Sequence, residues 1–385
     1  MKVLLVHNDY GKYSGEEAVV DKMAVMLAEM GHGVAQLRRS TAGARESLAG
    51  KIHGFLAGIY CPGGVRAMRD ALRRERPDVV NVHNLYPFIS PAALRECKKA
   101  GVPVVMTIHN FRLMCPTGLF MRDNAPCELC LQRGNEWGCV RHNCEHSLLK
   151  SAGYAARSAV ARVRRHYADC VDRFACITDF QRRKLIEAGF PAEKLLVVPN
   201  SVDAGTDVEL TPGGYVAYSG RISREKGVDL IIEVARRHPD IPFRLAGAVR
   251  DTELVAQLPP NVELTGYLSG EALSAFYAGA RFFVMASRWY EGFPMTILEA
   301  ARWAKPMIAP DHGGFTEIIG TGDSAIGRLV APADTNALES AVRHLWDSPD
   351  ESMRLGAAAR SSLIARYSTS AVSALWSDLL KQLTQ

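Results

Sequence analysis

The sequence predicts an α/β protein made of two doubly wound domains, each with a parallel sheet covered by helices. Strand-like apolar runs alternate with helix-like periodic segments in both halves of the chain. With 385 residues and 48% hydrophobic content, the chain is long enough for two cores of ordinary domain size. An acidic, aperiodic stretch at 202–214 contains proline and glycine and marks a linker. We therefore expect domains at residues 1–203 and 204–385.

The first half opens with an apolar strand at 1–8, followed by a short loop and a helix that runs to residue 30. Valine-rich runs at 78–83 and 102–110 predict two further strands of the same sheet. In doubly wound sheets, ligands bind beyond the carboxyl ends of the strands. We therefore expect functional side chains in the loops after these strands, and a binding cleft where the two domains face each other.

The second half opens with a short strand from residue 215, a loop with three cations and an amphipathic helix at 228–237. Arg221 and Lys226 in this loop could neutralise a diphosphate leaving group. Arginine offers a planar fork to phosphate oxygens and lysine offers a compact charge, so the two together suit a pyrophosphate. The alternative interpretation is a solvated basic loop.

The segment 287–300 is the most informative part of the chain, because it places two acids around a helix start. Proline is tolerated in the first turn of a helix, so Pro294 marks the start and Glu291 lies in the loop before it. Glu299 falls inside the helix among apolar residues. Free N–H groups at the helix start suit a phosphate, and the acids could accept hydrogen bonds from hydroxyls on either side. That layout matches a nucleotide-sugar, although both acids could instead be merely solvated.

Downstream, a predicted strand at 306–309 leads into a glycine-rich turn. Together these segments resemble the retaining glycosyltransferases of the GT-B fold, in particular family 4. The resemblance rests on three motifs in order: Gly-Arg-x4-Lys-Gly at 220–227, Glu-x7-Glu at 291–299 and Gly-Gly-x2-Glu at 313–317. It extends to the amino terminus, where family members usually have two glycines after the first strand. Ser14 replaces the first, which leaves Gly15 as the expected point of close backbone approach to the substrate.

The resemblance implies a GT-B enzyme that moves a hexose-type sugar from a UDP- or GDP-sugar to a saccharide or lipid-linked acceptor in cell-surface polysaccharide synthesis. It assigns catalytic roles to His109, Arg221, Lys226 and Glu291. The implied donor-binding residues are Gly15, Gly220, Tyr267, Phe293, Pro294, Met295, Thr296 and Glu299.

Two cations already balance the charge of the departing diphosphate, so we expect no catalytic divalent metal. No carboxylate is an obvious nucleophile, so we expect the front-face path proposed for the family rather than a covalent intermediate. The resemblance also raises the prospect that the last helix, at about 369–383, packs back across the hinge.

Five of the nine cysteines lie between residues 115 and 144, which makes an insertion at 115–146 distinctive. The apolar first strand does not read as a signal peptide, so we expect the reducing cytoplasm, where clustered cysteines more often hold a metal than form disulfides. We predict a structural zinc ion, since four thiolates leave no open position for catalysis. The predicted ligands are Cys115, Cys127, Cys130 and Cys144, with Cys139 as a spare. The alternative is a set of free thiols.

The formal net charge of +5 is modest for this length and does not suggest a nucleic-acid partner. Its distribution is uneven, because residues 146–168 contain five cations and no acid, interleaved with apolar residues. Such a helix could lie on an anionic membrane surface, or it could be an ordinary solvated helix. No run reaches the roughly 18 apolar residues needed to span a bilayer. We expect a cytoplasmic protein that could attach peripherally to the membrane.

Two other classes stay open. One is a GT-B enzyme of another reaction, such as a nucleotide-sugar epimerase or a phosphorylase. The other is a zinc-containing nucleic-acid-binding protein, suggested by the cysteines and the basic run. Hydride transfer and P-loop chemistry are disfavoured, because neither Gly-x-Gly-x-x-Gly after a strand nor Gly-x4-Gly-Lys-Ser/Thr occurs.

Overall fold

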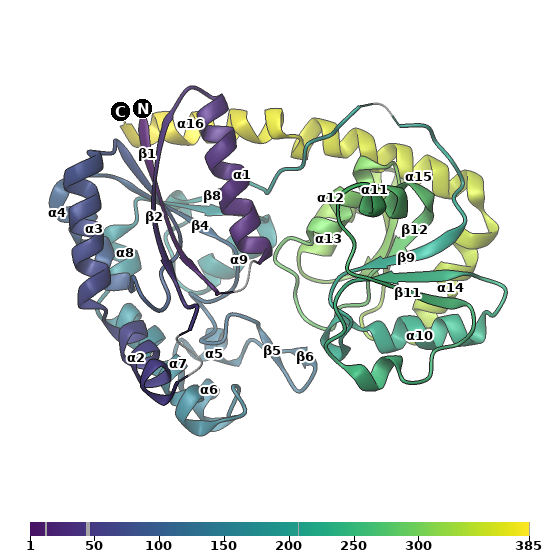
Figure 1. The fold of residues 1–385 in the computed structure, drawn as a ribbon, viewed down its shortest axis with the longest axis horizontal. Helices are drawn as coiled ribbons and strands as arrows, with labels where there is room; N and C mark the ends of the chain where they lie inside the picture. The colour runs from purple at the N-terminus through teal and green to yellow at the C-terminus, as the bar shows by residue number, and fades with distance from the viewer. Residues whose placement is uncertain (12–13, 44–46, 207, 385) are drawn as a thin grey trace. The chain divides into compact units, whose positions relative to one another are not determined.

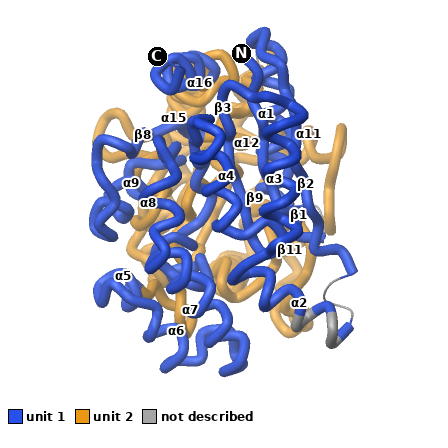
Figure 2. The backbone as a smooth tube through the Cα atoms, turned by 90° about the vertical axis from the view of Figure 1, so that its left-hand side faces the viewer, with its two compact units in different colours: residues 1–120, 128–199, 373–385 blue, residues 121–127, 200–372 orange. Residues whose placement is uncertain are grey.

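The computed structural model describes residues 1–11, 14–43, 47–206 and 208–384, and it divides the chain into two compact units (Figure 2). Unit 1 comprises Met1–Phe120, Glu128–Pro199 and Ser373–Gln385. Unit 2 comprises Met121–Cys127 and Asn200–Val372. The chain therefore leaves unit 1 and returns to it more than once.

Unit 1 contains a six-stranded parallel sheet in the order β2-β1-β3-β4-β7-β8. Its strands are β1 Lys2–Asp9, β2 Gly33–Ser40, β3 Val79–Asn84, β4 Val104–Ile108, β7 Arg173–Cys176 and β8 Leu195–Val197. Every residue of β3 and β4 is buried, as expected for central strands whose two faces are both covered.

Helices connect these strands and supply the outer layers of unit 1. They are α1 Gly15–Glu29, α2 Leu48–Ile59, α3 Pro62–Glu75, α4 Leu94–Ala100, α5 Leu129–Arg133, α6 Trp137–Arg141, α7 Leu148–Val163, α8 His166–Cys170 and α9 Asp179–Glu187. The last helix, α16 (Thr369–Thr384), begins in unit 2 and continues into unit 1, so both ends of the chain belong to unit 1 (Figure 1).

Unit 2 contains a second six-stranded parallel sheet, in the order β11-β10-β9-β12-β13-β14. Its strands are β9 Tyr215–Ser219, β10 Phe243–Ala246, β11 Val262–Gly266, β12 Ala280–Val284, β13 Met307–Pro310 and β14 Gly327–Val330. Its helices are α10 Val228–Arg237, α11 Gly270–Gly279, α12 Met295–Arg302, α13 Gly314–Ile319, α14 Thr335–Asp347 and α15 Pro349–Ser362. A two-stranded hairpin, β5 (Met121–Arg122) and β6 (Ala125–Pro126), is also grouped with this unit.

The strand order of each sheet reverses direction at one place. In unit 1 the reversal falls between β1 and β3, and in unit 2 it falls between β9 and β12. Helices that follow the two strands at such a switch point leave on opposite faces of the sheet, which opens a crevice at the carboxyl ends of those strands. The loops after β1, β3, β9 and β12 are therefore the places where the fold favours a ligand.

Most sequence-predicted elements agree with the structure to within a few residues. Helix α10 has the predicted limits, and α12 begins one residue after Pro294, which is the N-cap rather than the first helical residue. The structure divides the chain after Pro199, slightly before the predicted boundary at 203, and within the linker Asp207 lies outside the described residues. In the described part of the chain, no helix is both long enough and apolar enough to cross a bilayer.

Candidate functional site

The loops after β9 and β12 meet at an ion pair between Lys226 and Glu291. The Lys226 ammonium donates to Glu291 Oε1 over 2.5 Å, and both side chains are mostly buried, at 14% and 15% exposure. Ser287 Oγ and the Trp289 indole N–H donate to the same oxygen, over 2.9 and 2.7 Å. Burial raises the pKa of Glu291, but the charge and hydrogen bond of Lys226 outweigh this effect and leave the pKa below its usual value. Glu291 is therefore a carboxylate.

Two cations from the β9 loop lie against the indole ring of Trp289. The Lys226 ammonium is 5.1 Å from the ring centroid and the Arg221 guanidinium is 5.5 Å from it. Both distances are within the range of cation–π attraction. Arg221 itself is exposed, so its guanidinium remains open to a ligand. The two cations predicted from the sequence are thus brought to one place, beside the predicted acid.

A second ion pair fixes the β12 loop to the start of α10. Arg288 makes a bidentate contact with Asp229, with N–O distances of 2.6 and 2.7 Å, and its backbone N–H donates to the Glu225 carbonyl over 2.9 Å. Gly227 brings the loops closer still, because a Cβ at this residue would lie 1.9 Å from the Ala286 carbonyl oxygen. The position of Lys226 relative to Glu291 is therefore set by backbone packing as well as by charge.

The Gly313-Gly314 turn after β13 packs directly on the backbone of the acidic loop. The Gly314 N–H donates to the Glu291 carbonyl over 2.8 Å, and Gly313 has a positive φ of 61°. A Cβ at Gly314 would lie 2.6 Å from the Gly292 carbonyl oxygen, so only glycine fits there without a shift. His312 adds a hydrogen bond of 2.9 Å to the Ser287 carbonyl. The third motif thus supports the loop that carries Glu291.

Glu299 lies on α12, where Tyr277 holds it in place. The Tyr277 hydroxyl donates to Glu299 Oε2 over 2.7 Å. Burial, followed by the charge of Glu299, raises the pKa of Tyr277 well above its usual value, so the phenol keeps its proton. The Thr296 hydroxyl lies 3.5 Å from the Ser219 carbonyl, which places the first turn of α12 beside the end of β9, next to Gly220.

The remaining sequence-predicted residues of unit 2 have different surroundings. Tyr267, directly after β11, is 82% exposed. Phe293 is buried and packs edge-on against Tyr367, with ring centroids 5.8 Å apart. Pro294 is buried and Met295 is half-buried at the start of α12. Phe293 and Pro294 therefore serve the loop as packing residues, and only their backbone could face a ligand.

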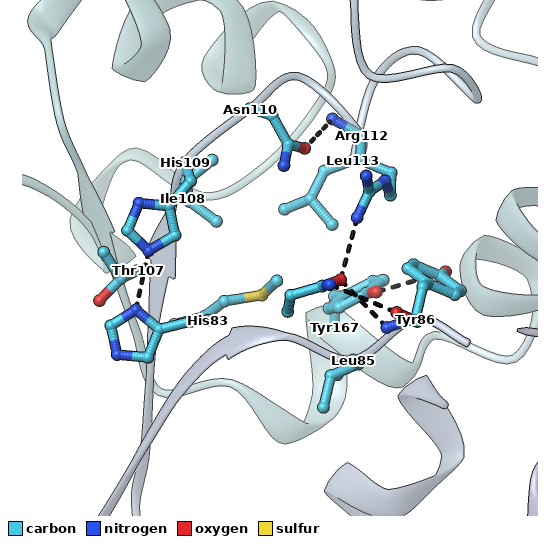
Figure 3. Close-up of a pocket in the computed structure, with 12 residues that line it drawn as sticks. His83, Leu85, Tyr86, Thr107, Ile108, His109, Asn110, Arg112, Leu113 and Tyr167 are labelled. Carbon is cyan, nitrogen blue, oxygen red and sulfur yellow. Dashed lines mark hydrogen bonds between the residues drawn. The ribbon is translucent and has the colours of Figure 1, made fainter. Parts of the chain in front are cut away.

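In unit 1, His109 follows β4 and pairs with His83 of β3. His83 Nδ1 and His109 Nε2 lie 2.7 Å apart, and the two rings stack with centroids 5.0 Å apart (Figure 3). Burial lowers the pKa of both rings, and the neighbouring His109 lowers that of His83 further. Both imidazoles are therefore neutral. They line a small pocket, with about 20 Å³ of free volume, that also includes Asn110 and Arg112.

A second pair of polar residues at the same sheet edge was missed by the sequence analysis. His7, at the end of β1, is fully buried, and neither ring nitrogen has a hydrogen-bond partner. Its Nδ1 lies 3.9 Å from Glu16 Oε1, which is also buried without a partner. The Tyr10 hydroxyl and the Asn110 amide hold the other oxygen of Glu16, at 2.9 and 3.5 Å. The signal was present in the sequence, as a histidine at a strand end and an acid in the first turn of the next helix.

Gly15 is the first residue of α1 and is exposed, and a Cβ there would meet nothing within 4 Å. Its neighbour Glu17 forms a capping box with Ser14. Among the described residues, His7, Asp9 and Glu17 bring potential metal ligands within 4.8 Å of one another. However, Glu17 already caps α1 and Asp9 pairs with Arg38 at 3.1 Å, so this group has protein partners instead of an open metal site.

The cysteines of the insertion have unequal surroundings. None of the nine cysteines, all of which lie in the described part of the chain, forms a disulfide. Cys139 is 1% exposed and its thiol lies 3.7 Å from the Ser151 carbonyl. A hydrogen bond to Cys144, then burial, then the neighbouring Cys115 and Cys130 raise the pKa of Cys139. Cys127 ends the segment that is grouped with unit 2, whereas the other cysteines of the insertion belong to unit 1.

The cations of the basic run at residues 146–168 are less available to a membrane surface than the sequence suggests. Arg157 lies over the rings of Tyr154 and Tyr86, at 3.7 and 4.6 Å from their centroids, and burial lowers its pKa. Arg162 pairs with Glu136 and Arg165 pairs with Asp169. Interpreting the run as five surface cations is therefore wrong for Arg157, because that side chain turns toward the core.

Two family models together match most of the chain. The model described as Glycosyltransferase Family 4 matches residues 13–205, and the model described as Glycosyl transferases group 1 matches residues 210–362. These matches include parts of both units and the loops after β3, β9 and β12, and the first match begins within the segment between β1 and α1.

The curated relatives that the chain resembles are sugar transferases by name. The chain is 29% identical to an alpha-D-kanosaminyltransferase of Streptomyces kanamyceticus, over 82% of this chain and 81% of the relative. It is 33% identical to a GDP-mannose-dependent alpha-mannosyltransferase of Mycolicibacterium smegmatis, over 44% of each chain.

Solved structures share the fold over nearly the whole chain. A sucrose-phosphate synthase from Thermosynechococcus elongatus superposes with a TM-score of 0.73 and 16% identity, covering 99% of this chain and 98% of the other. The Anabaena protein HepE, in complex with UDP and glucose, superposes with a TM-score of 0.69 and 16% identity, covering 99% and 100%. At this identity the likeness shows the fold alone, and that fold is GT-B.

Proposed function

Because the chain belongs to glycosyltransferase family 4, we propose that it is a retaining enzyme that moves a hexose-type sugar from a UDP- or GDP-sugar to a saccharide or lipid-linked acceptor in cell-surface polysaccharide synthesis. Relatives that transfer sugars support this proposal, among them an O-antigen chain mannosyltransferase of Escherichia coli, 28% identical over 38% of this chain. The complex of HepE with UDP and glucose supports a nucleotide-sugar donor.

The observation that carries the proposal is the cluster of Lys226, Glu291 and Arg221 around Trp289 at the switch point of unit 2. An ammonium group has three N–H donors, and Glu291 accepts from Lys226 through a single oxygen. Further N–H groups of Lys226 are therefore available to phosphate oxygens, together with the exposed guanidinium of Arg221. These two cations would stabilise the negative charge that develops on the departing diphosphate.

Glu291 would orient the donor sugar. All three hydrogen bonds that anchor this carboxylate go to Oε1. Oε2 is therefore the oxygen that we assign to sugar hydroxyls. An ionised carboxylate only accepts hydrogen bonds, so a hydroxyl-rich ligand is the matching partner.

Glu299 would bind the ribose in the same way, because Tyr277 holds Oε2 and leaves Oε1 for hydroxyls. The start of α12, with Met295 and Thr296, offers unpaired backbone N–H groups to the diphosphate. Gly220 would allow close approach of the nucleotide to the end of β9, and exposed Tyr267 would contact the base.

For unit 1 we propose the roles that the family resemblance implies. The backbone at Gly15 has open space around it, and we assign it to contact with the donor. The neutral ring of His109 could exchange hydrogen bonds with a sugar hydroxyl without bringing a competing positive charge. His83, which holds His109 at 2.7 Å, would set the orientation of that ring.

We further propose a front-face path, in which the departing diphosphate takes the proton of the acceptor hydroxyl, and chemistry that needs no divalent cation. A covalent path would need a carboxylate nucleophile, and Glu291 is the best candidate for that role. The Lys226–Glu291 contact supports the front-face path because it occupies one oxygen of this carboxylate. Product analysis by NMR tests the retention that this path requires: a retained anomeric configuration is expected, and an inverted one would contradict it.

The donor can be identified by thermal-shift measurements with UDP-, GDP- and dTDP-sugars. A true donor at a hundred times its dissociation constant should add about 2.7 kcal/mol to the free energy of unfolding. One nucleotide should stand out from the other two. Equal, negligible shifts for all three would contradict a nucleotide-sugar function.

Glu291→Ala is the sharpest test of the catalytic assignment. It removes the acceptor of the Lys226, Ser287 and Trp289 hydrogen bonds, so we expect sugar transfer to fall by a factor of about 10² to 10³, as for loss of one preorganised polar contact. Product formation with the identified donor is the measurement. Glu253→Ala, at an 88% exposed acid of the same unit, is the matched control. Wild-type turnover in Glu291→Ala would remove the proposed role.

Peripheral attachment to the cytoplasmic face of an anionic membrane is also part of the proposal. Leu148, Leu149 and Val163 of α7 are 65%, 75% and 69% exposed, while two of the neighbouring arginines pair with acids. Insertion of these apolar side chains should therefore contribute more to the free energy of membrane binding than the cations do, at roughly 1 kcal/mol per cation near such a surface. Co-sedimentation with phosphatidylglycerol vesicles should fall in a Leu148→Ser/Leu149→Ser variant. Equal binding by the variant and the wild type would reject this surface.

A further inference from the structure

Trp289 lies just before the Glu-x7-Glu motif and outside each of the three motifs that the sequence analysis singled out. The backbone on both sides of it is fixed by contacts within unit 2. The Arg288 N–H donates to the Glu225 carbonyl over 2.9 Å, and the Glu291 carbonyl accepts from the Gly314 N–H over 2.8 Å. The half-buried side chain of Trp289 is therefore placed by the fold of this unit before any ligand binds.

The indole ring of Trp289 makes two different kinds of contact in the candidate site. Its N–H donates to Glu291 Oε1 over 2.7 Å, on the oxygen that also accepts from Lys226. Its ring lies under the Lys226 ammonium and the Arg221 guanidinium, at 5.1 and 5.5 Å from the centroid. One side chain thus contacts both the acid proposed to bind the sugar and the cations proposed to bind the diphosphate.

The position of the Arg221 charge depends on this ring. Among the described residues, the Arg221 side chain makes no hydrogen bond or ion pair, and its contact is with the Trp289 ring. The Arg221 backbone is held, because its carbonyl accepts from the Tyr218 hydroxyl over 2.7 Å. However, an arginine side chain keeps considerable rotational freedom beyond its backbone, and attraction to an aromatic face restricts it. Trp289 therefore keeps the exposed guanidinium near Lys226.

An aromatic ring suits this place better than another acid would. A cation over an aromatic face is not neutralised and uses none of its N–H donors on the ring, so both remain for a diphosphate. A carboxylate in the same place would pair with the cations and compete with the phosphate oxygens. The electron-rich face also offsets the repulsion between two neighbouring positive charges, because it attracts each of them.

We propose that Trp289 is a positioning residue of the donor site: its N–H fixes the acid that orients the sugar, and its ring face holds Arg221 and Lys226 where the diphosphate binds. This inference rests on the proposed transfer from a nucleotide-sugar. Two separable effects follow from it. Loss of the N–H should slow turnover through Glu291, whereas loss of the ring face should weaken binding of the diphosphate through Arg221. A residue that only packs would change both properties together.

Trp289→Phe and Trp289→Leu separate the two effects, because phenylalanine keeps an aromatic face and leucine does not. Isothermal titration calorimetry with UDP and with GDP measures diphosphate affinity, and release of the same nucleoside diphosphate from its sugar donor measures turnover. Trp289→Phe should bind within about threefold of wild type but turn over about tenfold more slowly. Trp289→Leu should be equally slow and should also bind about tenfold more weakly.

Trp346→Leu is the matched control for these variants. Trp346 is a half-buried tryptophan of α14 that also lies under an arginine, with the Arg281 guanidinium 3.9 Å from its ring centroid. Trp346→Leu should keep the affinity and the turnover of the wild type. Equal affinities in Trp289→Phe and Trp289→Leu would overturn the proposal, as would wild-type turnover in Trp289→Phe.

A double-mutant cycle tests the placement of Arg221 directly. Arg221→Gln should weaken diphosphate binding about tenfold in the wild type, but by less than about threefold in Trp289→Leu, because the charge is no longer held there. Additive effects of the two substitutions, together with normal binding by the wild type, would overturn this inference alone. Wild-type protein that binds neither UDP nor GDP would contradict the proposed function itself.

Tryptophan emission covers the case in which Trp289→Leu fails to fold. Saturating wild-type protein with the nucleoside diphosphate that it binds should change this emission, because the charges over the Trp289 ring gain phosphate partners. Trp289→Phe should lose the change, and Trp346→Phe should keep it. An equal change in wild type and Trp289→Phe would show that the ring is not at the diphosphate.

Discussion

At the scale of single residues, the candidate site depends on the buried ion pair between Lys226 and Glu291. Lys226 and Glu291 were both predicted as ligands of the donor, yet they are 65 residues apart and nothing in the pattern joins them. Their contact follows from the sheet order, which sets the loops after β9 and β12 side by side. The position of Arg157 was not predicted. Its side chain turns inward over Tyr154, and this depends on packing that helical periodicity does not encode.

His7 and Glu16 were missed for a related reason. Each is unremarkable in the sequence, one ending an apolar strand and the other lying in the first turn of a helix. Only the structure shows that both carry buried polar atoms without partners, 3.9 Å apart. Unpaired buried polar groups are costly, and either water or a ligand at this switch point would satisfy them.

The neutral state of His83 leads to a prediction about pH. Burial and then the neighbouring His109 hold its pKa well below the ordinary value of 6.5, so the folded state favours the neutral ring. The unfolded chain consequently binds more protons below pH 6.5. The stabilisation is complete above this pH and is lost as the pH falls from about 6.5 toward the folded pKa.

We therefore expect the free energy of unfolding of the wild type to decrease between about pH 7.5 and pH 5.5. Urea denaturation at both pH values is the measurement. His83→Gln should reduce this decrease, whereas His53→Gln, at an exposed histidine of the same unit, should leave it unchanged. An identical decrease in wild type and His83→Gln would show that other groups cause it.

At the scale of elements, the helices were predicted well where a local signal defines their ends. The apolar periodicity of α10 gave its limits, and Pro294 gave the start of α12 to within one residue. The insertion was harder, because five-residue helices and positive φ angles leave no periodic signal. There the cysteines were the only guide to organisation.

The Gly313-Gly314 turn after β13 supports the loop that carries Glu291, and this contact leads to a prediction. A Cβ at Gly314 would meet the Gly292 carbonyl oxygen at 2.6 Å, so Gly314→Ala should push the acidic loop away from Lys226. We expect a loss of about 1 to 3 kcal/mol in stability, as for other overpacked sites, and a weaker thermal shift with the donor. Chemical denaturation and thermal-shift titration measure the two effects.

Gly214→Ala is the matched control for this substitution, because a Cβ there meets nothing within 4 Å. It should leave both stability and donor binding close to wild type. If Gly314→Ala bound donor as well as Gly214→Ala does, the turn would have no part in positioning Glu291.

At the scale of the whole molecule, the fold class was predictable because repeated strand–helix alternation needs only local patterns. The grouping of the segment Met121–Cys127 with unit 2 was not predicted. The return of residues Ser373–Gln385 to unit 1 agrees with the expectation for the last helix, but that expectation came from the family resemblance and not from a local pattern. Such regrouping depends on long-range contacts, which a single sequence does not display.

The return of α16 leads to a prediction about truncation. Trp376, Leu379 and Leu380 of this helix are 1%, 2% and 0% exposed, and they belong to the part grouped with unit 1. Removing residues 373–385 should therefore destabilise unit 1, since each large buried apolar side chain contributes about 1.5 to 3 kcal/mol. Differential scanning calorimetry should show a lower transition for unit 1. Nucleotide-dependent stabilisation of unit 2 should persist, and its loss would indicate that the helix also maintains the donor site.

The triple anchoring of Glu291 has a consequence for turnover. A carboxylate held by lysine, serine and tryptophan before any ligand arrives has already lost its rotational freedom during folding. In the proposed transfer, no reorientation of this carboxylate would be required in each cycle, and the surrounding dipoles would not have to rearrange as charge moves along the breaking bond. The rigidity of one side chain would thereby lower a recurring barrier, at an entropic cost met a single time, when the chain folds.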